Sequence, residues 1–241
     1  MEYQAARRTS HPGCKDWCEY RIDEYAISNN VWGKDNIKEY SAPYAQCIYS
    51  AGVKGPDQAG WDWIWPAWSE RKVLAYPAIA YGWKPWSQES TTANLPKQVG
   101  AINELTVSYQ LEFHATGIYN LAFDLWLTRS SIPSPEGITR EIMIWIDQEG
   151  IQPAGTLVDN IAIDEMDYAF YKKKFKEWDY LAFVSTSRSR VGKINVKRFL
   201  EYLLKNAHIT REEFLASIEF GNEISAGKGR LELQKYLISV R

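Results

Sequence analysis

The sequence predicts an all-β fold, a β-sandwich with one α-helix packed on its outside. Short segments that alternate apolar and polar residues, separated by turn residues, dominate the 241-residue chain. A single segment departs from this pattern and has helical spacing. The sequence contains no internal repeat and no long linker, which favours one domain, and a β-sandwich of this length is commonly undivided.

Three segments have the clearest alternation. In residues 105–113 the apolar face consists of Leu105, Val107, Tyr109, Leu111 and Phe113. In residues 119–128 the inward residues are Leu121, Phe123, Leu125 and Leu127, and the outward residues are Asn120, Ala122, Asp124, Trp126 and Thr128. Residues 215–223 place Ala216, Ile218 and Phe220 on one face and Glu219, Gly221 and Glu223 on the other. Each segment is therefore expected to be a strand with one face on the core.

A single amphipathic helix is predicted over residues 195–205. Its apolar positions follow the spacing i, i+3, i+4, i+7 and are Val196, Phe199, Leu200 and Leu203. Asn195 suits the N-cap and Asn206 stands where the helix should end.

Composition excludes two classes of partner. The net charge is −2, which argues against binding nucleic acid or a membrane surface by bulk electrostatics. The basic, aromatic segment 171–176 is better explained as a solvated surface in so neutral a chain. Mean hydropathy is −0.40, and no apolar run approaches the roughly 20 residues of a membrane-spanning helix. The three histidines are scattered, so we expect no metal and no cofactor.

Carboxylates stand on the polar face of three predicted strands. In residues 141–146 the three isoleucines point one way, while Glu141, Met143 and Trp145 point the other. Asp124 and Glu223 likewise lie opposite an apolar face. Retaining glycosidases need two carboxyls about 5–5.5 Å apart, and aromatic rings stack on sugars. If these strands are neighbours, the acids form a glycosidase site; otherwise they are ordinary surface carboxylates.

Five motifs occur in the order found in one family of enzymes. They lie at residues 29–33, 75–82, 123–126, 141–145 and 220–223. Together they resemble glycoside hydrolase family 12, endohydrolases of β-1,4-glucans of the cellulase type, some of which are xyloglucanases. Residues 82–86 are most similar to thermophilic prokaryotic members. The resemblance covers residues 14–241 as one catalytic domain, which leaves residues 1–13 as an N-terminal tail.

The resemblance implies a jelly-roll sandwich of two antiparallel sheets, whose concave sheet forms the substrate cleft. By the matching motifs, Glu141 takes the place of the nucleophile and Glu223 that of the acid/base. Asn222 precedes Glu223 where threonine is commoner. Asp124 corresponds to the acidic residue that contacts the nucleophile. The role of Glu219, on the same face as Glu223, is left open.

The sugar-binding aromatic residues are less specific, because core packing is the common role of tryptophan. Asn30 and Trp32 match a minus-side stacking position of the family, which Trp17 would extend. The other predicted contacts are Met143 and Trp145 beside Glu141, Trp63 from the alternating series Trp61, Trp63 and Trp65, and Trp83 and Trp86 in a loop.

The chain has three cysteines, so at most one internal disulfide can form and one thiol stays free. From the residues alone, three reduced thiols are an equal alternative. The family resemblance implies a bridge between Cys14 and Cys47 and a free Cys18, which favours an extracellular location. Residues 1–8 lack the apolar stretch of a signal peptide, so we expect that a leader has been removed.

The leading hypothesis is therefore a secreted, monomeric, retaining endo-β-1,4-glucanase whose partner is a polysaccharide. One alternative within the family prefers xyloglucan. Another is a non-catalytic glucan-binding module, which would need the aromatic residues without two matched acids. An inverting hydrolase, with carboxyls about 6.5–9.5 Å apart, is a further alternative.

Overall fold

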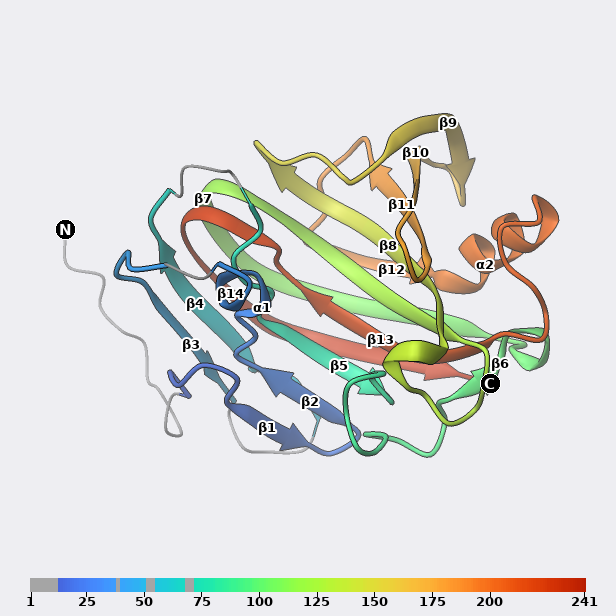
Figure 1. Ribbon diagram of the computed structural model, residues 1–241, viewed down its shortest axis with the longest axis horizontal. Helices are drawn as coiled ribbons and strands as arrows, with labels where there is room; N and C mark the ends of the chain where they lie inside the picture. The colour runs from blue at the N-terminus through green and yellow to red at the C-terminus, as the bar shows by residue number, and fades with distance from the viewer. Residues whose placement is uncertain (1–12, 38–39, 51–54, 68–71) are drawn as a thin grey trace.

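The protein is a β-sandwich in which the strands form one continuous hydrogen-bonded sheet that folds over on itself (Figure 1). The computed structural model describes residues 13–37, 40–50, 55–67 and 72–241. Within these ranges fourteen strands belong to the sheet. Residues 1–12 of the expected tail lie outside the described residues. Gly13 is already paired, since its backbone exchanges two hydrogen bonds with Ile48.

One layer carries the candidate site, and its strands follow one another across the sheet in a fixed order. They are β1 (Glu19–Ile22), β2 (Tyr25–Ser28), β5 (Ala78–Gly82), β13 (Phe214–Gly221), β7 (Leu105–Thr128), β8 (Ile138–Glu149), β11 (Asp179–Ser185), β10 (Met166–Lys174) and β9 (Thr156–Ile163). The short strand β6 (Lys97–Gln98) pairs with the start of β13. The antiparallel arrangement that the family resemblance implies has one exception, because β11 runs parallel to β8.

The second layer is built around the first half of β7. Its strands are β3 (Ala45–Tyr49), β4 (Gly60–Trp65), β14 (Ile224–Val240) and β12 (Val191–Asn195). Strand β7 therefore belongs to both layers: β14 pairs with its residues 105–119, while β8 and β13 pair with its second half.

Two glycines face each other where the β7–β14 pair begins to leave the second layer. Gly117 and Gly227 are register partners with φ of 121° and 112°. A Cβ on Gly117 would lie 2.3 Å from the carbonyl oxygen of Ala226, and one on Gly227 would lie 2.0 Å from that of Thr116. Only glycine combines this backbone conformation with so close an approach of two strands.

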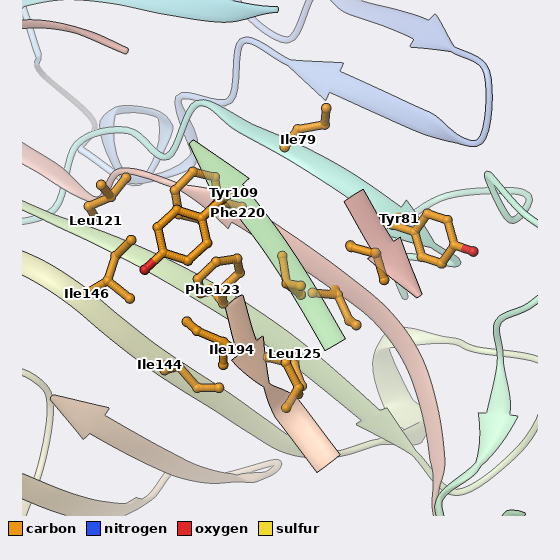
Figure 2. Packing of buried hydrophobic residues seen from close by; sticks show 14 of the residues in the cluster. Ile79, Tyr81, Tyr109, Leu121, Phe123, Leu125, Ile144, Ile146, Ile194 and Phe220 are labelled. Carbon is orange, nitrogen blue, oxygen red and sulfur yellow. The ribbon is translucent and has the colours of Figure 1, made fainter. Parts of the chain in front are cut away.

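The core between the layers confirms the predicted inward faces. The residues Leu121, Phe123, Leu125 and Leu127 are fully buried. Figure 2 shows Phe123 packed beside Phe220 and Tyr109, with ring centroids 4.6 Å apart for Phe123–Phe220 and 5.9 Å for Tyr109–Phe123. The predicted outward face of residues 119–128 is also buried, and its Asp124 and Trp126 line the cavity described below.

Strand β4 corrects one expectation. Trp61, Trp63 and Trp65 do share one face, but this face is the core, and Trp63 is only 2% exposed. Its ring packs on Phe113 and lies against Gly229, where a Cβ would meet it at 2.3 Å. The prediction that Trp63 binds substrate is therefore wrong.

The predicted outer helix is confirmed as α2 (Val196–Lys205), which buries Val196, Phe199, Leu200 and Leu203. Asn195 and Asn206 occupy its two cap positions, although the Asn195 side chain makes no capping hydrogen bond. The described chain also contains a one-turn helix, α1 (Trp32–Asp35), and the 3₁₀ turns η1 (Val99–Ala101) and η2 (Pro135–Gly137). None of the helices in the described ranges is long and apolar enough to span a membrane.

A disulfide joins Cys14 to Cys47, and Cys18 is a free, half-buried thiol. The bridge fastens the first described residues to β3, at a sequence separation of 33. It leaves the residues that follow, including Trp17, next to α1.

Replacing Cys14 and Cys47 by serine should lower the free energy of unfolding by about 3–4 kcal/mol, the loop-closure entropy for a loop of this length. Urea unfolding with and without the replacements measures the difference. Cys18→Ser is the matched control and should change the unfolding midpoint little. An unchanged midpoint for the double variant would contradict the stabilising role of the bridge.

Candidate active site

Three adjacent strands bring the predicted acids to one place. Asp124 on β7 is the register partner of Met143 on β8 and of Glu219 on β13. Glu141 on β8 is opposite Trp126 on β7. Because cross-strand partners lie on the same face of a sheet, these side chains form one patch.

The patch is the floor of a cavity of about 950 Å³. Asp124, Glu141 and Glu223 all line it, so the structure brings the three predicted acids together. Its other lining residues include some at and around α1 and some in the turn between β10 and β11.

Glu141 is held by an indole. The Nε1–H of Trp178 donates a hydrogen bond of 2.8 Å to Oε2 of Glu141. Removal from water by the cavity walls raises the pKa of Glu141 to about 8, and the negative charges of Glu223 and Glu219 act in the same direction. The hydrogen bond from Trp178 opposes them, since it stabilises the carboxylate.

Glu223 does not lie on a strand, as the alternation predicted, but in the two-residue link between β13 and β14. Asn120 holds it at three points. Its side-chain amide donates to the Glu223 carboxylate, its Oδ1 accepts the Glu223 N–H at 2.8 Å, and its own N–H donates to the Glu223 carbonyl at 3.0 Å. Burial raises the pKa of Glu223 to about 7, against the effect of the Asn120 amide.

Asn222 supports this link from the core side. Its Nδ2 donates to the Asn120 carbonyl at 2.7 Å, and its Oδ1 accepts the Trp61 Nε1–H at 2.9 Å. Asn222 is fully buried, and it uses both ends of its amide. An asparagine at this position thus ties the link to both β4 and β7.

Asp124 is buried, and among the described residues its Oδ1 has no hydrogen-bond partner. Burial and the neighbouring charge of Glu141 raise the pKa of Asp124 well above its ordinary value. A neutral Asp124 carboxyl is able to donate a proton in a hydrogen bond, and the cavity holds more carboxyls than it can keep charged together.

The aromatic residues that line the cavity form two groups. Trp17 and Trp32 lie at α1 and are 51% and 41% exposed. The Trp17 Nε1–H donates to Asp35 of α1 at 2.6 Å, and Asn30 Oδ1 accepts the backbone N–H of Trp32 at 2.9 Å. The second group consists of Trp86, Trp126, Trp178 and Phe175, whose rings contact one another in series.

Six of the predicted sugar contacts line the cavity: Asn30, Trp17, Trp32, Trp86, Met143 and Trp145. Met143 and Trp145 are buried in its floor, where the Trp145 indole and the Tyr180 hydroxyl both point to the Met143 sulfur at 3.4 Å. Trp83 does not line the cavity, because its indole turns back to the Ser87 carbonyl at 3.0 Å.

Sequence reasoning missed several residues of the site. Asn120 and Trp126 share the outward face with Asp124, so the alternation could have found them. Trp178 just before β11 and Tyr180 within it alternate, a weaker signal beside the mostly charged residues 172–177.

Buried paired carboxyls in an aromatic-lined groove on the face of a β-sandwich define a polysaccharide-cleaving glycoside hydrolase. The chain belongs to glycosyl hydrolase family 12, since the model of that family matches residues 23–241.

Individual relatives agree with this assignment. Endoglucanase S of Pectobacterium parmentieri is 29% identical over 91% of this chain and 83% of its own length. The probable xyloglucan-specific endo-β-1,4-glucanase A of Aspergillus terreus is 24% identical over 94% of this chain and 86% of its length. Among solved structures, the family 12 xyloglucanase of Bacillus licheniformis in complex with ligand superposes with a TM-score of 0.85 at 27% identity. That match covers 96% of this chain and all of the other.

The raised carboxyl pKa values predict how stability depends on pH. In the unfolded chain these groups titrate near pH 4.3, whereas in the folded protein they hold their protons to about pH 7 and 8. Between these limits the folded state binds more protons, so the contribution of these two groups to stability is fully present below about pH 4 and is lost as the pH rises towards 8.

The melting temperature should therefore decline by several degrees across this window, on the order expected for large carboxyl shifts. Glu141→Gln should flatten the decline, whereas the exposed Glu136→Gln should not. Melting curves between pH 4 and 9 test this, and equal slopes for all three proteins would contradict it.

Proposed function

We propose that the protein is a retaining endo-β-1,4-glucanase that cleaves internal bonds of a β-1,4-linked glucan by double displacement. Support comes chiefly from Glu141 and Glu223, which open into the same cavity and are near enough for the charge of Glu223 to raise the pKa of Glu141. A binding module would have no use for two desolvated acids in its groove.

In the first step, Glu223 gives its proton to the glycosidic oxygen while Glu141 attacks the anomeric carbon. The bond from carbon to the leaving oxygen breaks, and a bond to a Glu141 oxygen forms. These roles are the ones that the family motifs around Glu141 and Glu223 imply. Trp178 stabilises the charged form of Glu141, as a nucleophile requires, and Asn120 stabilises the charged form of Glu223, as its action as a base in the second step requires.

In the second step, Glu223 removes a proton from water, and the water oxygen displaces Glu141 from the anomeric carbon. Two inversions leave the product with the original β configuration. A protonated Asp124, whose pKa burial and the charge of Glu141 raise, would share the proton of the cluster with Glu141.

The glucan is proposed to lie along the cavity, with Asn30, Trp32 and Trp17 on the minus side. Residues 14–241 would form one catalytic domain that acts as a monomer and outside the cell, where its disulfide is stable. Xyloglucan is a second candidate substrate, favoured by the likeness to the xyloglucanase of B. licheniformis. Comparing rates on cellulose, mixed-linkage glucan and xyloglucan would rank the candidates.

The first product released should be the β anomer, with rapid loss of viscosity and new reducing ends. Proton NMR of the anomeric signals during early hydrolysis reads the configuration. Release of the α anomer would identify an inverting enzyme, and binding without any new reducing ends would identify a glucan-binding module.

Variants of the two acids should fail in different ways. Glu141→Gln should lower kcat by about 10⁴-fold or more and leave glucan binding largely intact, because only the nucleophile is lost. Glu223→Ala should retain the first step on substrates with good leaving groups, and azide should restore turnover by replacing the activated water.

The exposed Glu212→Gln serves as the control and should keep wild-type rates. Full activity of Glu141→Gln would exclude it as the nucleophile. If azide restores nothing and both classes of substrate slow equally, Glu223 is not the acid/base.

A further inference from the structure

A partly buried ion pair lies at the edge of the catalytic cluster. Lys84 Nζ is 2.6 Å from Oε2 of Glu219, and the Glu219 side chain is 1% exposed. Lys84 is 24% exposed and lines the cavity, and it belongs to the loop that follows β5. The pair therefore joins a loop at the cavity rim to a strand of its floor.

The pair stands next to the acids of the proposed reaction. Glu219 is the register partner of Asp124, and Asp124 is that of Met143, two residues from Glu141. Lys84 thus brings one positive charge to a group of acids. Its charge lowers the pKa of Asp124, against burial and the neighbouring carboxylates, which raise it.

The second oxygen of Glu219 makes a different contact. Trp126 Nε1–H donates to Glu219 Oε1 at 3.1 Å. The Trp126 ring meets Trp86 edge to face at 4.8 Å and Trp178 at 5.8 Å, and Trp178 donates to Glu141. A continuous series of contacts therefore runs from Lys84 through Glu219 and the indoles to Glu141.

We propose that Lys84 and Glu219 are a positioning pair for the hydrolysis: Glu219 fixes the indole wall that holds Glu141, and Lys84 balances the negative charge of the cluster. This inference rests on the proposed function and adds two residues to it. Neither residue needs to touch the reacting atoms. Their effect passes through Trp126 and through the electric field in a poorly solvated site, where charges act strongly.

The two halves of the pair have opposite electrostatic effects, which makes the inference testable. Loss of Lys84 leaves Glu219 buried without its counter-charge, so the neighbouring acids should hold protons more tightly. Glu219→Gln keeps the size of the side chain and an oxygen for Trp126, but leaves Lys84 unbalanced, so the acids should release protons more easily.

Other groups also face the cluster and must stay constant in the comparison. Those on the packed elements are Asp124, Glu141, Glu223, Tyr76 and Tyr180, and those at the rim are Lys176 and Glu177. Burial and nearby carboxylates raise the pKa of Tyr76 and Tyr180 well above the ordinary value, so both stay neutral.

The test compares pH profiles of kcat on a soluble glucan. The acid limb should move to higher pH in Lys84→Met and to lower pH in Glu219→Gln, each by about one pH unit, and should return near the wild-type position in the double variant. In both single variants kcat at the optimum should fall about 10-fold to 100-fold, with a smaller change in KM. Lys84→Arg keeps the charge and should keep the wild-type limb.

The inference would be overturned if the acid limbs of Lys84→Met and Glu219→Gln moved in the same direction, or if kcat fell while the limbs did not move. The pair would then contribute only to packing. NMR titration of ¹³C-labelled carboxyls in the same proteins gives a readout independent of activity, and Glu219→Gln should titrate its acids at lower pH. If the wild type cleaves no glucan, the proposed function fails, while this titration still decides the role of the pair. Should Lys84→Met not fold, Glu219→Gln and Lys84→Arg decide it alone.

Discussion

Crowding of carboxyl groups in a poorly solvated pocket is the constraint on which this molecule depends. Asp124, Glu141 and Glu223 line one cavity and Glu219 is the register partner of Asp124, although like charges in such a place repel and disfavour ionisation. The opposite face of the same strands supplies the compensation, with Phe123 and Ile142 fully buried in the core. The acids thus lie on one face of the sheet and the hydrophobic core lies on the other. Weakening the core would therefore separate the acids.

Much of this arrangement could be predicted from the sequence, and the parts that could not depend on long-range pairing. Alternation gave the faces of β7 and β8, and the motifs around Glu141 and Glu223 indicated the family. The parallel pairing of β11 with β8 has no local signal, because it depends on which strand edges remain available. The position of Glu223 in a link also has no local signal. It depends on Asn120, distant in the sequence, which hydrogen-bonds both the side chain and the backbone of Glu223.

Tryptophan was the hardest residue to assign, for a physical reason. Its large ring suits a core as well as a sugar face, and alternation shows which rings share a side but not what that side meets. The series on β4 therefore entered the core, where Trp61 even supports Asn222. Trp126 and Trp178, which sequence reasoning did not assign to the site, form the wall beside Glu141. What distinguishes the two sets is which face of the folded sheet they lie on, the core or the cavity, a property that appears only in three dimensions.

Because strand β7 belongs to both layers, it limits how the two layers can move relative to each other. Domain closure by hinge or shear requires two bodies that slide or rotate across a weak boundary. Here β14 remains hydrogen-bonded along β7 from Leu105 to Tyr119, so no such boundary separates the layers. The two layers therefore form one rigid frame. Movements that tighten contacts with a bound polymer must therefore come from the loops at the rim of the cavity, such as residues 83–87 and 174–178. The enzyme should release its product without a large rearrangement of the frame.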